Sequence, residues 1–336
     1  MSAGEAKMLS ASFELLLSKL DRRPVLFDIG AAVAPPEVWQ PIAPHSVYVG
    51  FDPDLREMQT RTDYPYHQAV IVNEAVTGDA GRSHAHFYFT KSPTCSSTLK
   101  PDAPSLAEYL FADLFVVERE AGVRATTLDA VLDRLALPGV DWLKTDSQGT
   151  DLRLFESLKP DRRARVLALD LEPGLIDAYV GEDLFVDAHK QLLKSGFWLS
   201  NLEVQGTVKM RSSTLRRLKS MEPDPAFDQA ATSIKISPGW VNARYLRTLS
   251  WLAQGDFSKR DYMVLWVFAC LDAQLGFAGD LAVEYEKRFG QDDTSRLMLA
   301  ETLQAISRLG HRRRSIFEKA KSLFFARKLS VFWKDQ

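Results

Sequence analysis

The stretch Pro24-Val-Leu-Phe-Asp-Ile-Gly30 indicates the fold class, because it is a short apolar run that ends in an acidic residue and a glycine. Comparable runs follow at residues 46–51 before Asp52, 68–72 before Asn73, 140–145 before Asp146 and 165–171 before Glu172. Segments with helical spacing lie between them, including 54–60, 127–135 and 150–158. Apolar strands that alternate with helices predict an α/β domain with a mostly parallel central sheet covered on both faces.

A polar side chain follows each of these strands. In open α/β sheets, ligands bind outside the carboxyl ends of the strands, so these side chains are expected to face one crevice. The residues in question are Asp28, Asp52, Asn73, Asp146 and Glu172. Gly30 would let the backbone turn and approach a ligand closely. Asp52 follows Gly30 by 22 residues, a spacing that suits the ribose hydroxyls of a nucleoside.

The turn after the first strand contains a single glycine, because residues 28–36 read DIGAAVAPP. A pyrophosphate requires several glycines so that backbone amides can surround it. The turn therefore argues against NAD or FAD and favours a nucleoside without a pyrophosphate, such as S-adenosylmethionine. The alternative is an ordinary strand–turn with a structural glycine.

The stretch Leu143-Lys-Thr-Asp-Ser-Gln-Gly-Thr-Asp151 resembles a motif of the FkbM-type methyltransferase family, approximately L-K-x-D-x-[EQ]-G-x-E, and its Gln-containing subgroup most closely. Other segments resemble the family in the same order, over about residues 24–205: 27–31, 51–54, 73–78, 96–97, 127–129 and 196–197. The resemblance implies a Rossmann-like class I methyltransferase fold, S-adenosylmethionine as the cofactor, and O-methylation of hydroxyls, often those of sugars in glycans.

The predicted cofactor-binding residues are Asp28, Gly30, Ala31, Asp52, Asn73 and Asp146. Asp146 is also predicted to be catalytic, because a positioned carboxylate can hold or deprotonate the acceptor hydroxyl. Its alternative role is to satisfy the amino terminus of the helix that begins near Thr150. Lys144 lies on the same strand face as Asp146 and is the second catalytic candidate, with a structural ion pair as the alternative.

The predicted substrate-binding residues are Gln148, Glu172, Ser96 and Ser97. Their alternative roles are structural, in the turn after the fourth strand and in the surrounding loops. No metal is predicted, since His84 and His86 share a strand face but lack a third ligand. Cys95 and Cys270 have the spacing of neither a disulfide framework nor a metal site. With no signal-peptide pattern at the amino terminus, a cytoplasmic location is expected.

Three regions are expected: an amino-terminal helix within 1–23, the methyltransferase domain at 24–239, and an all-helical region at 240–336. Residues 84–90 and 113–126 are expected to form extra strands. Residues 311–336 carry eight Lys or Arg and two acids, a net charge of +6. This basic, aromatic segment suits a peripheral contact with an anionic membrane, and packing on its own domain or in a homodimer is the alternative.

The function expected from these features is O-methylation of a hydroxyl, on a small molecule or a glycan. One alternative is a non-catalytic module that binds a nucleoside or a protein partner, supported by the run Ala31-Ala-Val-Ala34 after the glycine. A nicotinamide-dependent dehydrogenase would need the missing glycines. Nucleic-acid methylation is not expected, because the net charge is −2 and no N/D-P-P-Y motif follows the fourth strand.

Overall fold

The computed structural model describes residues 11–31, 34–54, 56, 64–222, 227 and 233–309. The chain divides into two compact units, one spanning Leu17–Leu265 and one that combines Met1–Leu16 with Trp266–Gln336. The division falls inside helices α1 (Ala11–Ser18) and α10 (Lys259–Leu271), not at the expected boundary near residue 240. The larger unit contains the sheet and the candidate site.

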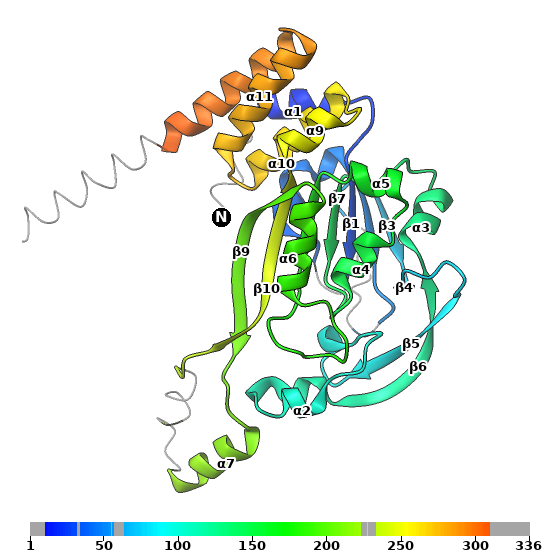
Figure 1. Cartoon of the computed structure of the whole chain (residues 1–336), viewed down its shortest axis with the longest axis vertical. Helices are drawn as coiled ribbons and strands as arrows, with labels where there is room; N and C mark the ends of the chain where they lie inside the picture. The colour runs from blue at the N-terminus through cyan, green and yellow to red at the C-terminus, as the bar shows by residue number, and fades with distance from the viewer. Residues whose placement is uncertain are drawn as a thin grey trace, which may run out of the picture. The chain divides into compact units, whose positions relative to one another are not determined.

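Among the described residues, seven strands form the central sheet, in the order β3-β2-β1-β7-β8-β10-β9 (Figure 1). In that order the strands are Gln68–Val72, Val47–Phe51, Val25–Ile29, Trp142–Thr145, Ala168–Leu171, Ser237–Arg247 and Phe197–Thr207. The strands from β3 to β8 are parallel, whereas β10 is antiparallel to both of its neighbours. The predicted α/β class with a mostly parallel central sheet is therefore confirmed.

One face of the sheet supplies the main hydrophobic core. Phe27 on β1 and Leu143 on β7 are fully buried there, with Leu132 of α3, Phe155 of α4 and Leu192 of α6. The helices of the larger unit are α2 (Ala103–Leu106), α3 (Leu128–Arg134), α4 (Asp151–Glu156), α5 (Pro160–Arg165), α6 (Phe185–Lys194), α7 (Ser212–Met221) and α9 (Leu249–Gln254). Side chains alternate between the two faces of a strand, so every second residue of these strands points into this core.

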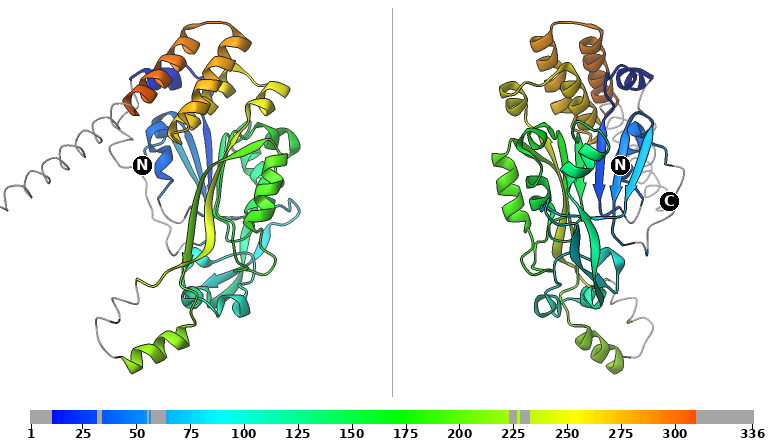
Figure 2. Two further views of the ribbon diagram at one scale, coloured as in Figure 1. Left: turned by 60° about the vertical axis from the view of Figure 1, so that its left-hand side comes forward. Right: turned by 90° about the vertical axis from the view of Figure 1, so that its right-hand side faces the viewer.

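The opposite face of β1 and β2 is covered by the 3-10 helix η2 (Glu37–His45), drawn in blue on the other side of the sheet from α6 in Figure 2. Trp39 of η2 lies edge-on to the rings of Tyr48 and Trp142. Further along, this face is polar, because the strand registers align four charged residues across β1, β7, β8 and β10. They are Asp28, Lys144, Asp170 and Arg244.

A smaller sheet, in the order β4-β6-β5, adjoins the loop that follows the third strand. Its strands are β4 (Ala75–Val76), β6 (Val117–Thr126) and β5 (His84–Thr90). The extra strand expected at 84–90 is confirmed, and the one expected at 113–126 begins at Val117 because the 3-10 helix η4 (Leu110–Phe115) occupies the residues before it. A short 3-10 helix, η3 (Pro93–Cys95), follows β5.

The predicted C-terminal helical region is confirmed by α9, α10, α11 (Leu275–Phe289) and the helix at 293–309, but its expected start at residue 240 was wrong, because β10 extends to Arg247 inside the central sheet. Its sequence alternates strictly: Val241, Ala243 and Tyr245 are buried in the core, and Asn242 and Arg244 lie on the other face. β9 was also not expected. β9 and β10 pair with each other along most of their length as a long antiparallel hairpin, the hairpin arm. β10 also pairs with β8 on its other side.

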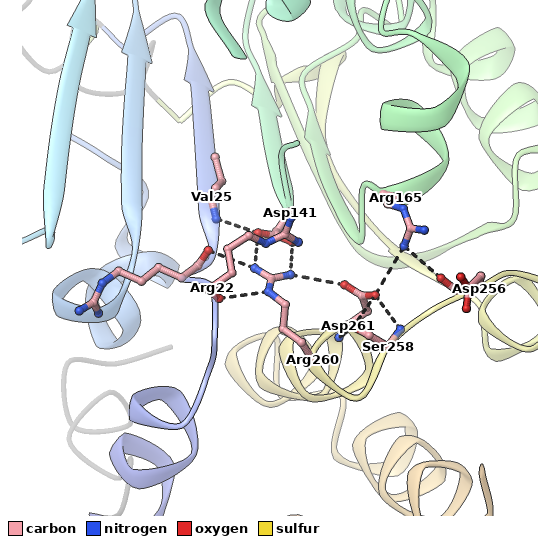
Figure 3. A network of polar contacts seen from close by, with 9 residues as sticks. Arg22, Val25, Asp141, Arg165, Asp256, Ser258, Arg260 and Asp261 are labelled. Carbon is pink, nitrogen blue, oxygen red and sulfur yellow. Dashed lines mark hydrogen bonds and ion pairs between the residues drawn. The ribbon is translucent and has the colours of Figure 1, made fainter. Parts of the chain in front are cut away.

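A buried ion pair joins the amino-terminal ends of β1 and β7 to the start of α10 (Figure 3). Asp141 accepts two hydrogen bonds from the Arg260 guanidinium, at 2.6 and 2.8 Å, and a third from the Val25 amide at 2.8 Å. Arg260 also donates to the carbonyl oxygens of Arg22 and Arg23. This network fixes the end of the sheet opposite the candidate site.

The smaller unit contains α11 (Leu275–Phe289) and a further helix at 293–309. Within the described residues, no helix has both the length and the apolar character needed to cross a bilayer. The basic segment 311–336 and the helix expected at 54–60 lie largely or wholly outside the described residues. The predicted membrane or dimer contacts of the basic segment therefore stay predictions.

Candidate functional site

A pocket opens at the carboxyl ends of β1, β2 and β7, and Asp52 and Asp146 line it among the five polar residues expected to share one crevice. It encloses about 680 Å3, counting space that is open to solvent. Gly30, Asp52, Asp146, Gln148 and Ser96 line it together. Phe51, Pro53, Val76 and Phe87 provide its apolar walls. A pocket with this mixture of polar and apolar lining suits a small organic ligand.

Asp146 is held in the pocket wall by a hydrogen bond from its own turn and an ion pair from its own strand. Gln148 donates its side-chain amide to Asp146 Oδ1 at 2.5 Å, and the Lys144 ammonium lies 3.7 Å from Oδ2. The side chain stays 27% exposed, so it can also meet a ligand. The capping alternative is not supported, because the cap position of α4 is Thr150 and no side chain caps the described amino terminus of this helix.

The turn that carries Gln148 is tied to two loops. Gln148 has a left-handed backbone (φ 58°), which a residue with a side chain rarely adopts, and Gly149 follows with φ 102°. The Tyr179 hydroxyl lies 2.8 Å from Gln148 Oε1, and the Ser97 hydroxyl donates to the Gln148 carbonyl at 2.7 Å. Gln148 and Ser97 therefore position Asp146, whereas Ser97 itself does not line the pocket.

Gly30 has a structural reason to be glycine. Its backbone has φ 80°, and a Cβ atom there would lie 2.3 Å from the Asp146 carbonyl oxygen. Gly30 therefore makes the predicted close approach to the backbone of Asp146, directly after β7. The amides of Gly30 and Ala31 both donate to the Phe51 carbonyl at 3.0 Å, so these two amides are not free to bind a phosphate. Ala31 is buried beside Gly50, and Ala32 and Val33 lie outside the described residues.

Asp28 lies behind the pocket and not in its wall. Its buried carboxylate accepts a hydrogen bond from the Tyr48 hydroxyl at 3.0 Å and pairs with the Lys144 ammonium at 3.1 Å. Burial opposes the charge of Lys144, but the carboxylates of Asp28 and Asp146 outweigh it and raise the pKa of this lysine. Lys144 is thus a charged bridge between Asp28 and Asp146, in line with the ion-pair alternative.

Asp52 lines the pocket at the end of β2. Its Oδ1 accepts from the Asp54 amide at 2.7 Å, and burial raises its pKa to about 6. Asn73 is exposed, and its side-chain amide lies 3.5 Å from the Asp52 carbonyl oxygen. Its neighbour Glu74 lines the pocket and pairs with Arg124 at 2.6 Å. Glu74 therefore provides the polar side chain that was expected from Asn73 in this part of the pocket.

Ser96 lines the pocket and is held in a polar cluster. Its hydroxyl accepts from the Thr90 amide and from the Arg56 guanidinium, both at 3.1 Å. Arg56 in turn donates twice to Asp54, at 2.6 and 3.0 Å. Asp54 and Arg56 were missed in the sequence, although Asp54 belongs to the F-D-P-D segment that carried the family resemblance.

Glu172 lies next to Asp146 at the carboxyl end of β8 but outside the pocket wall. Burial and the nearby carboxylate of Asp146 raise its pKa to about 8. Burial also raises the pKa of Asp151 to about 6 and that of Glu182 to about 7. Acids with raised pKa values gather around this end of the sheet, which is a feature of functional sites.

The pocket is acidic. Asp52, Asp54, Glu74 and Asp146 line it, and none of its described lining residues is a lysine or arginine. Asp54 and Glu74 are neutralised from outside the pocket by arginines. Among the described residues, no group of three His, Cys, Asp or Glu side chains could hold a metal ion. The arrangement therefore favours a ligand that carries positive charge and hydrogen-bond donors.

No protein-family model matches this chain, and no curated protein matches it either.

Proposed function

We propose that this protein is an S-adenosylmethionine-dependent O-methyltransferase that acts on a hydroxyl of a sugar. The observation that carries the proposal is the acidic pocket at the carboxyl ends of β1, β2 and β7, which is lined by Asp52 and Asp146. A carboxylate at the end of the second strand suits ribose hydroxyls. A second one, on β7, suits the neighbourhood of a sulfonium.

The charge of the pocket distinguishes this ligand from a dinucleotide. A pyrophosphate needs free backbone amides or basic side chains, and the Gly30 and Ala31 amides are occupied by the Phe51 carbonyl. S-adenosylmethionine has no phosphate and carries a positively charged sulfur, so an acid-lined pocket supports its binding. When bound, it supplies a methyl group bonded to that sulfur.

The topology also supports the proposal. The antiparallel strand β10 lies between β8 and the edge strand β9 in an otherwise parallel sheet. This order and direction are compatible with the proposed class I methyltransferase fold. A plain dinucleotide-binding fold instead continues with parallel strands.

The residues of this chain then have distinct tasks. Asp52 would hold the ribose, and Phe51, Val76 and Phe87 would flank the base. Asp146, fixed by Gln148 and Lys144, would accept a hydrogen bond from the acceptor hydroxyl and align it with the methyl group. Alignment is the main requirement of an in-line displacement.

The test combines binding with turnover. Isothermal titration calorimetry with S-adenosylmethionine and S-adenosylhomocysteine should show binding of both, and NAD should not bind. Radiolabelled methyl transfer to a panel of sugar glycosides should then yield methyl ethers. Absence of cofactor binding would refute the proposal. Binding of both ligands, with no transfer to any hydroxyl compound, would favour the non-catalytic nucleoside-binding module.

A further inference from the structure

Two polar side chains face each other beside Asp146, at the carboxyl end of β8. Leu171 pairs with Ala243, and the Val241 amide donates to the Pro173 carbonyl at 3.2 Å, so Glu172 after β8 lies opposite Asn242 on β10. Strand alternation places both side chains on the sheet face that carries Lys144 and Asp146. Neither residue has a part in the pocket wall described above.

Within the described residues, no donor gives a hydrogen bond to the side-chain oxygen of Asn242 or to the carboxylate of Glu172. Asn242 Oδ1 is buried and has no hydrogen-bond partner in that part of the chain. Glu172 is tied to its surroundings through its backbone amide, which donates to Asp151 at 3.1 Å, and over the described ranges its carboxyl group enters no hydrogen bond or ion pair. A buried acceptor left unsatisfied costs free energy, which indicates that an external donor completes this pair.

Burial and the charges around Glu172 bring its pKa close to neutral pH. Asp146 and Lys144 face it from β7, Asp151 from α4, and Asp170 from its own strand, with Arg244 of β10 paired to Asp170 at 2.7 Å. Burial and the surplus of neighbouring carboxylates raise the pKa of Glu172 to about 8. A base works best when its pKa is close to the working pH.

We infer that Glu172 removes the proton from the acceptor hydroxyl, and that Asn242 holds a second hydroxyl on the adjacent carbon, so that the acceptor is a vicinal diol. This inference rests on the proposed methyltransferase function. Side chains opposite each other on neighbouring strands have Cβ atoms about 5 Å apart, close enough to bind two hydroxyls of one sugar ring.

The reaction balances without a further reactant. The hydroxyl oxygen forms a bond to the methyl carbon as the bond between that carbon and sulfur breaks. The electron pair of the broken bond goes to sulfur, which loses its positive charge. The hydroxyl proton goes to the Glu172 carboxylate, and the products are a methyl ether and S-adenosylhomocysteine. Asp146, which accepts a hydrogen bond from Gln148 and pairs with the Lys144 ammonium, orients the hydroxyl.

The experiment uses the full chain with tritiated S-adenosylmethionine. The acceptors are methyl glycosides with vicinal diols, such as methyl α-mannoside and methyl α-rhamnoside, each with its monodeoxy counterpart. Glu172→Gln should lower kcat by roughly 10²–10⁴-fold and remove the rise of activity with pH toward about 8. Asn242→Ala should raise KM for the diol by roughly tenfold and leave kcat within about threefold, since it removes binding that is uniform along the reaction. Calorimetry with S-adenosylmethionine should give wild-type affinity for both variants.

Glu203→Gln is the matched control, because it makes the same chemical change at an exposed position of β9 and should leave kcat and KM unchanged. If Glu172→Gln keeps kcat within about threefold of wild type, or if the pH dependence disappears in Asp146→Asn and persists in Glu172→Gln, Glu172 is not the base. Cofactor binding without methylation of any diol glycoside would overturn the vicinal-diol inference and leave cofactor binding intact. Failure to bind S-adenosylmethionine would instead overturn the proposed function.

Discussion

Replacing Gly30 by alanine should destabilise the larger unit through two separable effects. The backbone at Gly30 has φ 80°, and the new Cβ atom would lie 2.3 Å from the Asp146 carbonyl oxygen and 3.2 Å from the Asp146 carbonyl carbon. The clash is with backbone, so no side chain can rotate away. The ends of β1 and β7 would have to separate at the pocket.

The magnitude follows from the two effects. A left-handed backbone costs a residue with a Cβ atom about 1–2 kcal/mol. Overpacking against a rigid neighbour adds about 1–3 kcal/mol, so the free energy of unfolding should fall by about 2–5 kcal/mol. For a unit of this size, that corresponds to a decrease in Tm of roughly 5–15 °C.

Two other glycines separate the effects. Gly181 has φ 73° and open space where a Cβ atom would lie, so Gly181→Ala should show the backbone effect alone, about 1–2 kcal/mol. Gly139 has neither a positive φ nor a close neighbour, so Gly139→Ala should be neutral or stabilising by up to about 1 kcal/mol. Thermal and urea unfolding of the three variants measures the series. A loss for Gly30→Ala no larger than that for Gly181→Ala would refute the contact between β1 and β7.

Three further predictions follow from the buried charges. Arg260→Met should lower the free energy of unfolding, measured in urea, by about 3–5 kcal/mol, because it leaves Asp141 buried without its cation. Arg165→Met, at the exposed edge of the same network, should lower it by less than about 1 kcal/mol. Equal losses in the two variants would contradict a buried ion pair between Arg260 and Asp141. Asp52→Asn should weaken S-adenosylmethionine binding by roughly 10–100-fold in calorimetry. Asp79→Asn, in an exposed loop, should leave the Kd unchanged. An unaltered Kd in Asp52→Asn would show that Asp52 does not bind the cofactor. Glu172 has a folded-state pKa of about 8, above its unfolded value of about 4.3, so its contribution to stability is lost as the pH rises between these values. Tm should therefore fall from pH 6 to pH 8.5, and Glu172→Gln should make Tm depend less on pH. An equal dependence of Tm on pH in both proteins would contradict the raised pKa.

Local patterns were enough to predict the parallel half of the sheet. The apolar runs that end at Asp28, Asp52, Asn73, Asp146 and Glu172 each became a strand, and the sheet brought their ends to one edge. Strand periodicity and a terminal polar residue are short-range features, so they can be recognised without knowing which strands are neighbours. The same alternation is present in 241–245, although the helical sequence that follows favours a helix there.

What each polar residue does was decided only by the tertiary structure. Asp28 and Asp146 both end a strand, yet Asp28 is buried behind Lys144 and Asp146 faces the pocket, because their partners come from other strands. Gly30 is required by the Asp146 carbonyl, which is far away in the chain. Glu172 acquires its neighbour Asn242 through an antiparallel strand that returns from the hairpin arm. Contacts between residues so far apart depend on strand order and register, which no local pattern encodes.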